Sequence, residues 1–230
     1  MNEIQTKFYN AFIVKDRWLL YFKGLGVTME IAVIAGIIGI VIGCIIALMK
    51  LSEPKKGHKH TIWWTIATVY VDIIRGTPAV LQLLIMWFIV FSSSNNGVLV
   101  ASLSFGINSG AYVSEIIRAG ILAVDRGQTE AGRSLGLTRG QTMKEIVLPQ
   151  AIKNVLPPIG NEFITLIKET AIVGYVSLSD LTRVASQISS RTYEAFMPLI
   201  GAAVIYFVII KVLTLLLEAL ERRLRKSDLR

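Results

Sequence analysis

The sequence is poor in charged residues and in cysteine. Charged residues make up 17% of the 230 residues and hydrophobic residues 53%. A soluble domain averages about 25% charged residues, and it needs them to cover its surface. The composition therefore argues against a cytosolic enzyme and a disordered chain, and it is typical of an integral membrane protein. The single cysteine, Cys44, excludes an intrachain disulfide and a multi-cysteine metal site.

Signatures of catalysis and nucleotide binding are also missing. The chain has no G-x-x-x-x-G-K-[ST] loop for nucleotide phosphates, so any ATP that its function needs must be bound by another chain. Its two histidines, His58 and His60, lie in a basic segment without an acidic cluster, and we expect no metal site there. No histidine lies in a long apolar run, which argues against an intramembrane enzyme with a catalytic histidine.

What the sequence does contain is long apolar runs. A helix needs about 20 mostly apolar residues to cross a bilayer core of about 30 Å. Five segments fit a membrane-spanning helix: 24–49, 79–91, 98–114, 159–178 and 195–220. A Ser/Asn-rich turn, 92–97, separates the second segment from the third. The sequence therefore predicts an all-α integral membrane protein with five core transmembrane helices, in a single domain that covers residues 1–230.

The distribution of basic residues predicts the orientation. Lysine and arginine concentrate in the first connection, 50–59, in the long connection 118–153 and in the tail after residue 221. Cytoplasmic loops carry an excess of these residues, so we expect the C-terminus in the cytoplasm and the N-terminus outside. The net charge of +8 then reflects topology, and we expect no nucleic acid partner.

A helix break is predicted before the second span. The apolar stretch 61–71 is short and is followed by Arg75, Gly76, Thr77 and Pro78. The residue before a proline is pushed out of helical geometry. We therefore predict a surface or partly inserted helix, a break at 75–78 and a membrane helix that begins at residue 79.

The segment 125–158 is long for a connection, and its varied composition predicts structure of its own. We expect a short helix over 128–135 that ends at Gly136 as its C-terminal cap. Thr138 is the expected N-cap of a second helix that runs through Val147. Pro149 should end that second helix.

The same segment resembles the EAA loop of the inner-membrane permease subunits of ABC importers. The family pattern reads Glu-Ala-Ala, three residues, Gly, nine residues, Ile, one residue, Leu-Pro. This chain departs from it only at the third position, where glycine lowers helix propensity by up to about 1 kcal/mol, so the first helix should be less rigid. The residues expected to couple to an ATPase are Glu130, Ala131, Gly132, Leu135, Gly136, Ile146, Leu148 and Pro149.

Other segments resemble the polar amino acid subgroup of these permeases. They are 75–78 with Gln82, 112–121 and 160–163. The resemblance implies a MetI-like type I importer permease in the inner or plasma membrane, surrounded by membrane lipid, with 125–158 as its cytoplasmic coupling loop. It also implies a second permease subunit, two cytoplasmic ATPase subunits and an extracytoplasmic amino acid binding protein. ATP and Mg²⁺ would be bound by the ATPase, so we expect no cofactor and no catalysis in this chain.

A homodimer of permease subunits is favoured, because this chain carries both the coupling loop and polar residues within its predicted spans. Gly36, Gly39 and Gly43 of the first span would permit close helix packing, including at a dimer contact.

Ionisable residues inside a predicted span are candidate substrate contacts. They cost at least ~2.5 kcal/mol near the bilayer centre and usually face a cavity. Glu162 is the first candidate, with Asn161 beside it and with Thr165 and Glu169 close to the same helical face. The alternative is that Glu162 pairs with a neighbouring helix for structural reasons.

Three more residues are candidate substrate contacts near the predicted break and in the third span. Arg75 suits the bidentate recognition of a carboxylate, or it pairs with Asp72 three residues earlier. Gln82 and Tyr112 line a pathway or satisfy helix contacts. Glu115, three residues before Arg118, should form a local ion pair with it.

The carboxylate of Glu162 favours a cationic amino acid such as arginine, lysine or histidine, because a cationic ligand would offset the cost of burying that charge. Glutamine or another polar amino acid is the alternative, since Asn161 and Thr165 suit hydrogen bonds to an amide. The alternative from another functional class is that the chain is an ion channel or a secondary transporter. It predicts inverted repeats or a midplane ion site, and it leaves the segment 125–158 without a role.

Overall fold

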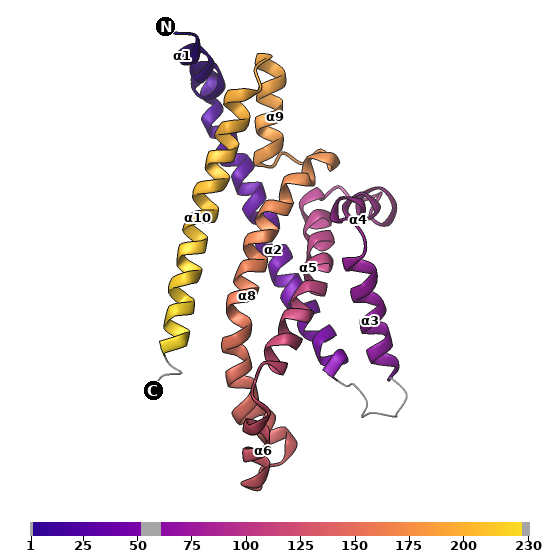
Figure 1. The fold of residues 1–230 in the computed structure, drawn as a ribbon. Coiled ribbons are helices and arrows are strands. Elements are labelled where there is room, and N and C mark those ends of the chain that lie inside the picture. Colours follow the sequence, from indigo (N-terminus) through magenta and orange to yellow (C-terminus); the bar gives the residue numbers. More distant parts are fainter. Residues whose placement is uncertain (1, 52–60, 227–230) are drawn as a thin grey trace. The chain divides into compact units, whose positions relative to one another are not determined.

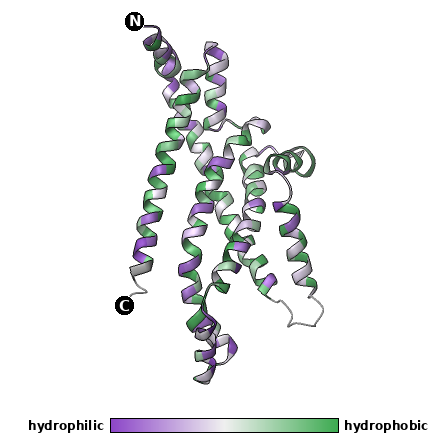
Figure 2. Cartoon of the chain, viewed as in Figure 1, coloured by the Kyte–Doolittle hydropathy of each residue, from purple (hydrophilic) through white to green (hydrophobic). Residues whose placement is uncertain are grey.

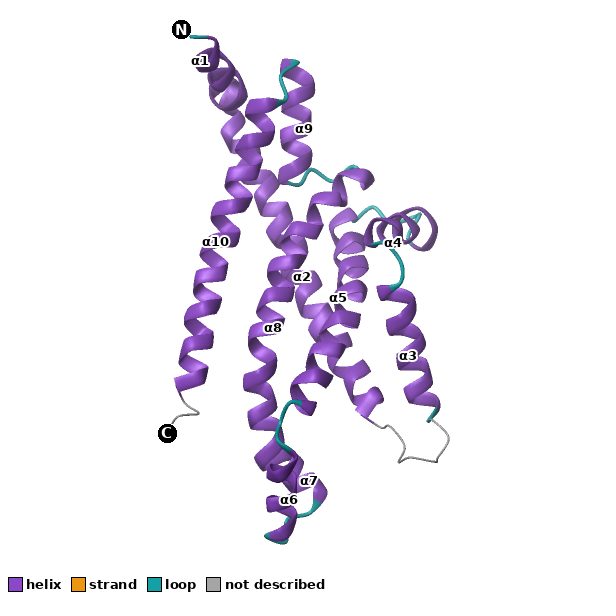
Figure 3. Ribbon diagram, viewed as in Figure 1, coloured by secondary structure: helices purple, strands orange, loops and turns teal. Residues whose placement is uncertain are grey.

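The computed structural model describes residues 2–51 and 61–226. These residues form helices joined by turns, with no strand among them (Figure 3). The histidines 58 and 60 and most of the basic first connection lie outside the described residues. The α-helices are α1 (Glu3–Phe8), α2 (Arg17–Leu51), α3 (Ile62–Arg75), α4 (Ala79–Ile85), α5 (Gly97–Leu122), α6 (Arg126–Ser134), α7 (Arg139–Thr142), α8 (Leu148–Glu169), α9 (Leu181–Thr192) and α10 (Phe196–Lys226).

The chain folds into two compact units, each made of segments far apart in the sequence. Unit 1 comprises Met1–Ile37, Thr77–Gly106 and Phe163–Thr214. Unit 2 comprises Ile38–Gly76, Ile107–Glu162 and Leu215–Arg230. The long helices α2, α5, α8 and α10 contribute residues to both units. The prediction of a single domain stays a prediction.

Unit 1 has two apolar clusters. In the first, Ile31 of α2, Leu83 of α4 and Phe105 of α5 are buried against Leu166 of α8. The second is formed by buried residues of α2, α9 and α10: Tyr21, Leu181, Val184, Ala185, Ile188 and Ala202. Figure 1 shows α9 beside the first turns of α10, as this second cluster requires.

Unit 2 is organised around the second half of α5. Ile46 of α2 and Val71 of α3 are buried with Ala111 of α5. The glycine row of α2 allows this packing, because a Cβ at Gly43 would lie 2.5 Å from Cγ1 of Val113 and one at Gly39 3.0 Å from Cβ of Ser109. Gly39 and Gly43 therefore serve a contact inside the chain.

Within the part of the chain that the structure describes, three helical segments are long and apolar enough to cross a membrane: Glu3–Leu51, Gly97–Leu122 and Phe196–Leu224. The pair formed by Ile62–Arg75 and Ala79–Val90 counts as a fourth if its two helices form one bent span. The break between them falls where Pro78 predicts it, with Pro78 extended at the start of α4. The predicted span 159–178 covers the end of α8 and a 3₁₀ segment, Thr170–Val176, and its helical part includes the polar residues Asn161 and Glu162. Figure 2 shows apolar residues along most of α10 and a more polar α6.

The prediction that Pro149 ends a helix is wrong. The chain stays helical from Arg139 to Glu169, through α7, a wider turn at Met143–Val147, and α8. The N–H of Leu148 donates to the carbonyl of Met143, five residues earlier. A turn of this width directly before Pro149 accommodates a ring that has no N–H to donate.

Candidate functional site

The predicted coupling segment begins with a well-capped helix, α6. Asp125 accepts a hydrogen bond from the N–H of Gly127 at 2.7 Å. At the other end Gly136 has a φ of +86°. The N–H of Gly136 donates to the carbonyl of Arg133, and that of Leu137 donates to the carbonyl of Gly132. This pair of bonds is a Schellman motif, which confirms Gly136 as the C-terminal cap.

The helix that follows begins where the sequence predicts. Thr138 caps α7 by accepting from the N–H of Gln141, while the side chain of Gln141 accepts from the N–H of Thr138 at 2.8 Å. Gly132 is buried, and a Cβ there would lie 2.8 Å from Cδ1 of Ile146 and from Cγ2 of Thr142. The glycine at the third position of the EAA pattern therefore lets α6 pack closely on the next turns of the same chain.

Most of the other predicted coupling residues are accessible. Glu130, Ala131 and Pro149 are exposed, as is Leu135 at 81%, while Ile146 is half-buried. Leu135 and Leu148, which is 41% exposed, are apolar side chains that reach the surface of this segment. Such exposed apolar side chains are suited to a contact with another protein.

Glu162 lies on α8 and is held by α5. Its Oε1 accepts a hydrogen bond from Oγ of Ser109 at 2.9 Å. Ser109 is 1% exposed and Glu162 is half-buried. Within residues 2–51 and 61–226, no basic side chain forms an ion pair with Glu162. Ser109 was not among the site residues predicted from the sequence.

The other predicted substrate contacts near Glu162 on α8 lie in different environments. Asn161 is exposed and lines a pocket with Asn154 and Glu221. Consecutive residues of a helix point about 100° apart, so Asn161 and Glu162 face different neighbours. Thr165 and Glu169 are half-buried members of unit 1.

Arg75 and Tyr112 meet in unit 2. The guanidinium carbon of Arg75 lies 5.2 Å from the centre of the Tyr112 ring, a cation–π contact. This contact replaces the expected ion pair with Asp72, which among the described residues is not formed. Gln82 forms hydrogen bonds across the helix break. Its Nε2 donates to Oγ1 of Thr77 at 2.7 Å and to the carbonyl of Thr77.

A row of polar side chains on α5 contacts three other helices. Glu115 pairs with Lys50 of α2 at 2.6 Å, whereas the expected partner was Arg118. Ser109, Tyr112 and Glu115 follow one another at intervals of three residues, and they contact α8, α3 and α2. This spacing places them along one side of the helix. The spacing of polar residues in an apolar helix is a signal that would have identified Ser109.

The part of the chain that the structure describes contains no group of three or more His, Cys, Asp or Glu side chains placed to hold a metal ion.

Comparison with known proteins identifies the family. Residues 39–226 match the family described as "Binding-protein-dependent transport system inner membrane component". The arginine transport system permease protein ArtQ of Bacillus subtilis (strain 168) is 44% identical over 211 residues, which are 90% of this chain and 93% of ArtQ. The putative glutamine transport system permease protein GlnP of Rickettsia bellii (strain RML369-C) is 40% identical over 209 residues, with the same coverage.

A solved structure has the same fold. One chain of a crystal structure described as an amino acid ABC transporter with histidines is 45% identical to this chain and superimposes with a TM-score of 0.81. The match covers 89% of this chain and 94% of that chain. The predicted fold class, an all-α importer permease, is confirmed. The chain belongs to the family of inner membrane components of binding-protein-dependent transport systems.

Proposed function

We propose that this chain forms the translocation pathway for a polar amino acid in an ATP-driven importer, with a preference for cationic amino acids. The observation that carries the proposal is the carboxylate of Glu162, which is held by Ser109 on the neighbouring helix α5. The relatives support the class of substrate, since their names refer to arginine and glutamine transport and the similar structure is described as containing histidines.

Ser109 orients the carboxylate without neutralising it. The hydroxyl occupies Oε1, and among the described residues Oε2 accepts no hydrogen bond. An ionised carboxylate in a low-dielectric setting is costly unless it is paired. The ammonium or guanidinium group of a cationic amino acid would supply the missing charge, and a charge-assisted hydrogen bond to Oε2 would fix its position.

The energy for import would come from a pair of ATPase subunits that bind ATP and Mg²⁺, while this chain catalyses no reaction. The exposed residues of the coupling segment, above all Glu130, Leu135 and Leu148, are the proposed contact with the ATPase. A second permease subunit, in our proposal another copy of this chain, would complete the pathway. An extracytoplasmic binding protein would deliver the amino acid, with the N-terminus of the permease outside and its C-terminus in the cytoplasm.

The test is uptake by the complete complex, with ATPase and binding protein, in liposomes. Glu162→Gln keeps the shape of the side chain and removes its charge. Losing a hydrogen bond to a charged group costs about 1.5–3 kcal/mol, so ATP-dependent arginine uptake should fall at least about tenfold. Glutamine uptake should fall much less. The matched control is Glu218→Gln, which removes an exposed carboxylate of α10 and should change neither rate.

Each of the following results would contradict the proposal. Equal loss of arginine and glutamine uptake, or no loss of either, would leave Glu162 as a structural residue. A glutamine importer would instead transport glutamine well and arginine poorly in the unaltered complex. Uptake by this chain alone, without ATP, would indicate an ion channel or a secondary transporter.

A further inference from the structure

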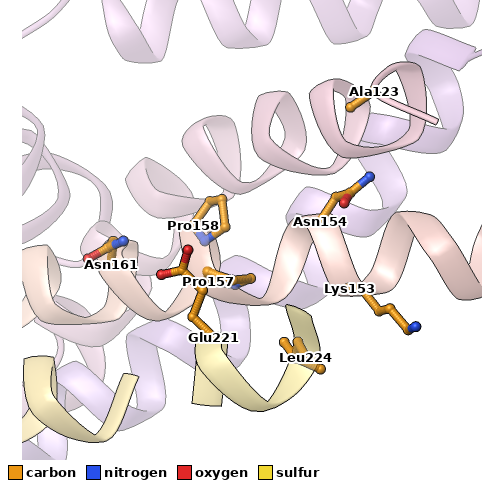
Figure 4. A pocket seen from close by; sticks show the side chains of 8 residues that line it. All are labelled: Ala123, Lys153, Asn154, Pro157, Pro158, Asn161, Glu221 and Leu224. Atoms are coloured by element: carbon orange, nitrogen blue, oxygen red, sulfur yellow. The ribbon is translucent and has the colours of Figure 1, made fainter. Parts of the chain in front are cut away.

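A pocket of about 500 Å³ lies in unit 2 (Figure 4), and neither Glu162 nor Ser109 is among its lining residues. Pockets for small ligands have volumes of about 300–1,000 Å³ and contain a few convergent polar groups. Two helices and the residue that follows α5 line this one. The lining residues are Ala123 directly after α5, Lys153, Asn154, Pro157, Pro158 and Asn161 from α8, and Glu221 and Leu224 from α10.

The side chains of the pocket separate positive from negative charge. Figure 4 shows the carboxylate of Glu221 beside Pro157 and directed toward Asn161, with the ammonium group of Lys153 at the other end of the pocket. The apolar surfaces of Pro157, Pro158 and Leu224 lie between the charged groups or beside them. A ligand with a cationic group at one end and an anionic group at the other matches this distribution.

The backbone and one amide prepare the site. Nδ2 of Asn154 donates to the carbonyl of Gly120 at 3.4 Å, which directs the side chain of Asn154 toward α5. Pro158 follows Asn154 by four residues inside α8 and, having no N–H, cannot give the carbonyl of Asn154 its usual helical hydrogen bond. Rigid prolines and a held amide reduce the ordering that ligand binding would require.

We propose that this pocket is a second binding site, in which a free α-amino acid is held with its ammonium group at Glu221 and its carboxylate near Lys153. The ligand class rests on the proposed function, but the site does not include Glu162. Asn161 belongs to the pocket and precedes Glu162 on α8, and Ala123 belongs to it and lies two residues before the coupling segment. The pocket therefore receives the amino acid on the coupling side, after it has left Glu162.

The test measures binding to the full chain in nanodiscs of phosphatidylcholine and phosphatidylglycerol, with L-arginine and L-glutamine as probes. The Glu162→Gln background removes the proposed substrate contact, so saturable binding that remains reports the pocket. Adding Glu221→Gln should weaken binding at least about tenfold, because a charge-assisted contact is lost. Adding Glu218→Gln, a change of the same kind on an exposed side chain of the same helix, should leave the affinity within about twofold.

Two further arms test the ligand chemistry without relying on one variant. Agmatine, which is arginine without its α-carboxylate, should bind more weakly than arginine, and Lys153→Met should remove the difference between them. A phosphatidylethanolamine headgroup also carries an ammonium and an anionic group. If the chain retains this lipid through Glu221 and arginine does not displace it, the occupant is a lipid and the proposal is overturned.

The proposal is also overturned if the Glu162→Gln chain shows no saturable binding, or if neither Glu221→Gln nor Lys153→Met affects it. That failure is distinct from failure of the proposed function, because the loss of arginine uptake in Glu162→Gln is measured in the complete complex. An intact response of uptake to Glu162 with no binding at the pocket would remove only the second site.

Discussion

The C-terminal cap of α6 gives a sharp test, because the chain offers a matched pair of glycines. A Cβ added at Gly136 or at Gly140 would meet no other atom within 4 Å. The two positions differ in backbone conformation, since Gly136 has a φ of +86° and Gly140 lies inside α7. Gly136→Ala should cost about 1–2 kcal/mol for a left-handed residue, whereas Gly140→Ala should gain up to about 1 kcal/mol in helix propensity.

The effect should be confined to the end of α6 and is best measured by hydrogen exchange. The amides of Gly136 and Leu137 donate to the carbonyls of Arg133 and Gly132. A local cost of about 1–2 kcal/mol should make both amides exchange about 5–30-fold faster. In Gly140→Ala they should exchange no faster than in the unaltered chain.

A Cβ would meet no atom at either site, so the variants differ in the backbone conformation of the substituted residue. Equal exchange rates at residues 136 and 137 in the two alanine variants would therefore refute this reasoning. Gly136→Val should have a larger effect, with normal membrane insertion and reduced coupling to the ATPase. Normal ATP-dependent uptake by a complex that carries Gly136→Val would count against a coupling role for α6.

Three further perturbations concern helix packing and charge. A Cβ at Gly120 would overlap Cγ2 of Val155, so Gly120→Ala should lower the stability in detergent by about 1–3 kcal/mol, and adding Val155→Ala should restore part of it. Lys50→Met and Glu115→Gln should each lower the melting temperature, because each leaves a largely buried charge without its partner. The double variant Lys50→Met with Glu115→Leu removes both charges and should recover most of that loss. Additive losses in the double variant would contradict the pairing. Asp180 caps α9, and its burial raises the pKa of its carboxyl above the ordinary value, with hydrogen bonds from Thr182 and Arg183 opposing the shift. A raised pKa in the folded state contributes stability at acidic pH, and this contribution is lost as the pH rises through the folded-state pKa. The stability of Asp180→Asn relative to the unaltered chain should therefore increase toward neutral pH. A stability difference that does not change with pH would contradict the burial argument.

Features that depend on adjacent residues could be predicted from the sequence. The left-handed cap at Gly136, the N-cap at Thr138 and the break before Pro78 each follow from the backbone preferences of a few neighbouring residues. The failure at Pro149 shows the limit of such rules. A proline excludes a normal helical hydrogen bond, but a wider turn that directly precedes it allows the helix to continue.

The partners of the charged residues could not be predicted in this way. Glu115 has Arg118 one turn further along α5, yet it pairs with Lys50, which is 65 residues away in the chain. Arg75 contacts Tyr112 instead of Asp72. In both cases the predicted partner was a neighbour three residues away, because helix periodicity predicts only contacts within about one turn.

The sequence by itself determined the membrane-helix composition, the capped helices within 125–158 and the family, because hydrophobicity, capping and a spaced motif are properties of residues close together in the chain. Only the tertiary structure decided that Glu162 is held by Ser109, that Gly132 packs against its own chain, and that Asn161 lines a pocket with Glu221. Such contacts depend on how each helix is rotated about its axis and which helix packs against it. Many side chains spread over distant segments set that packing together, and no local pattern records the result.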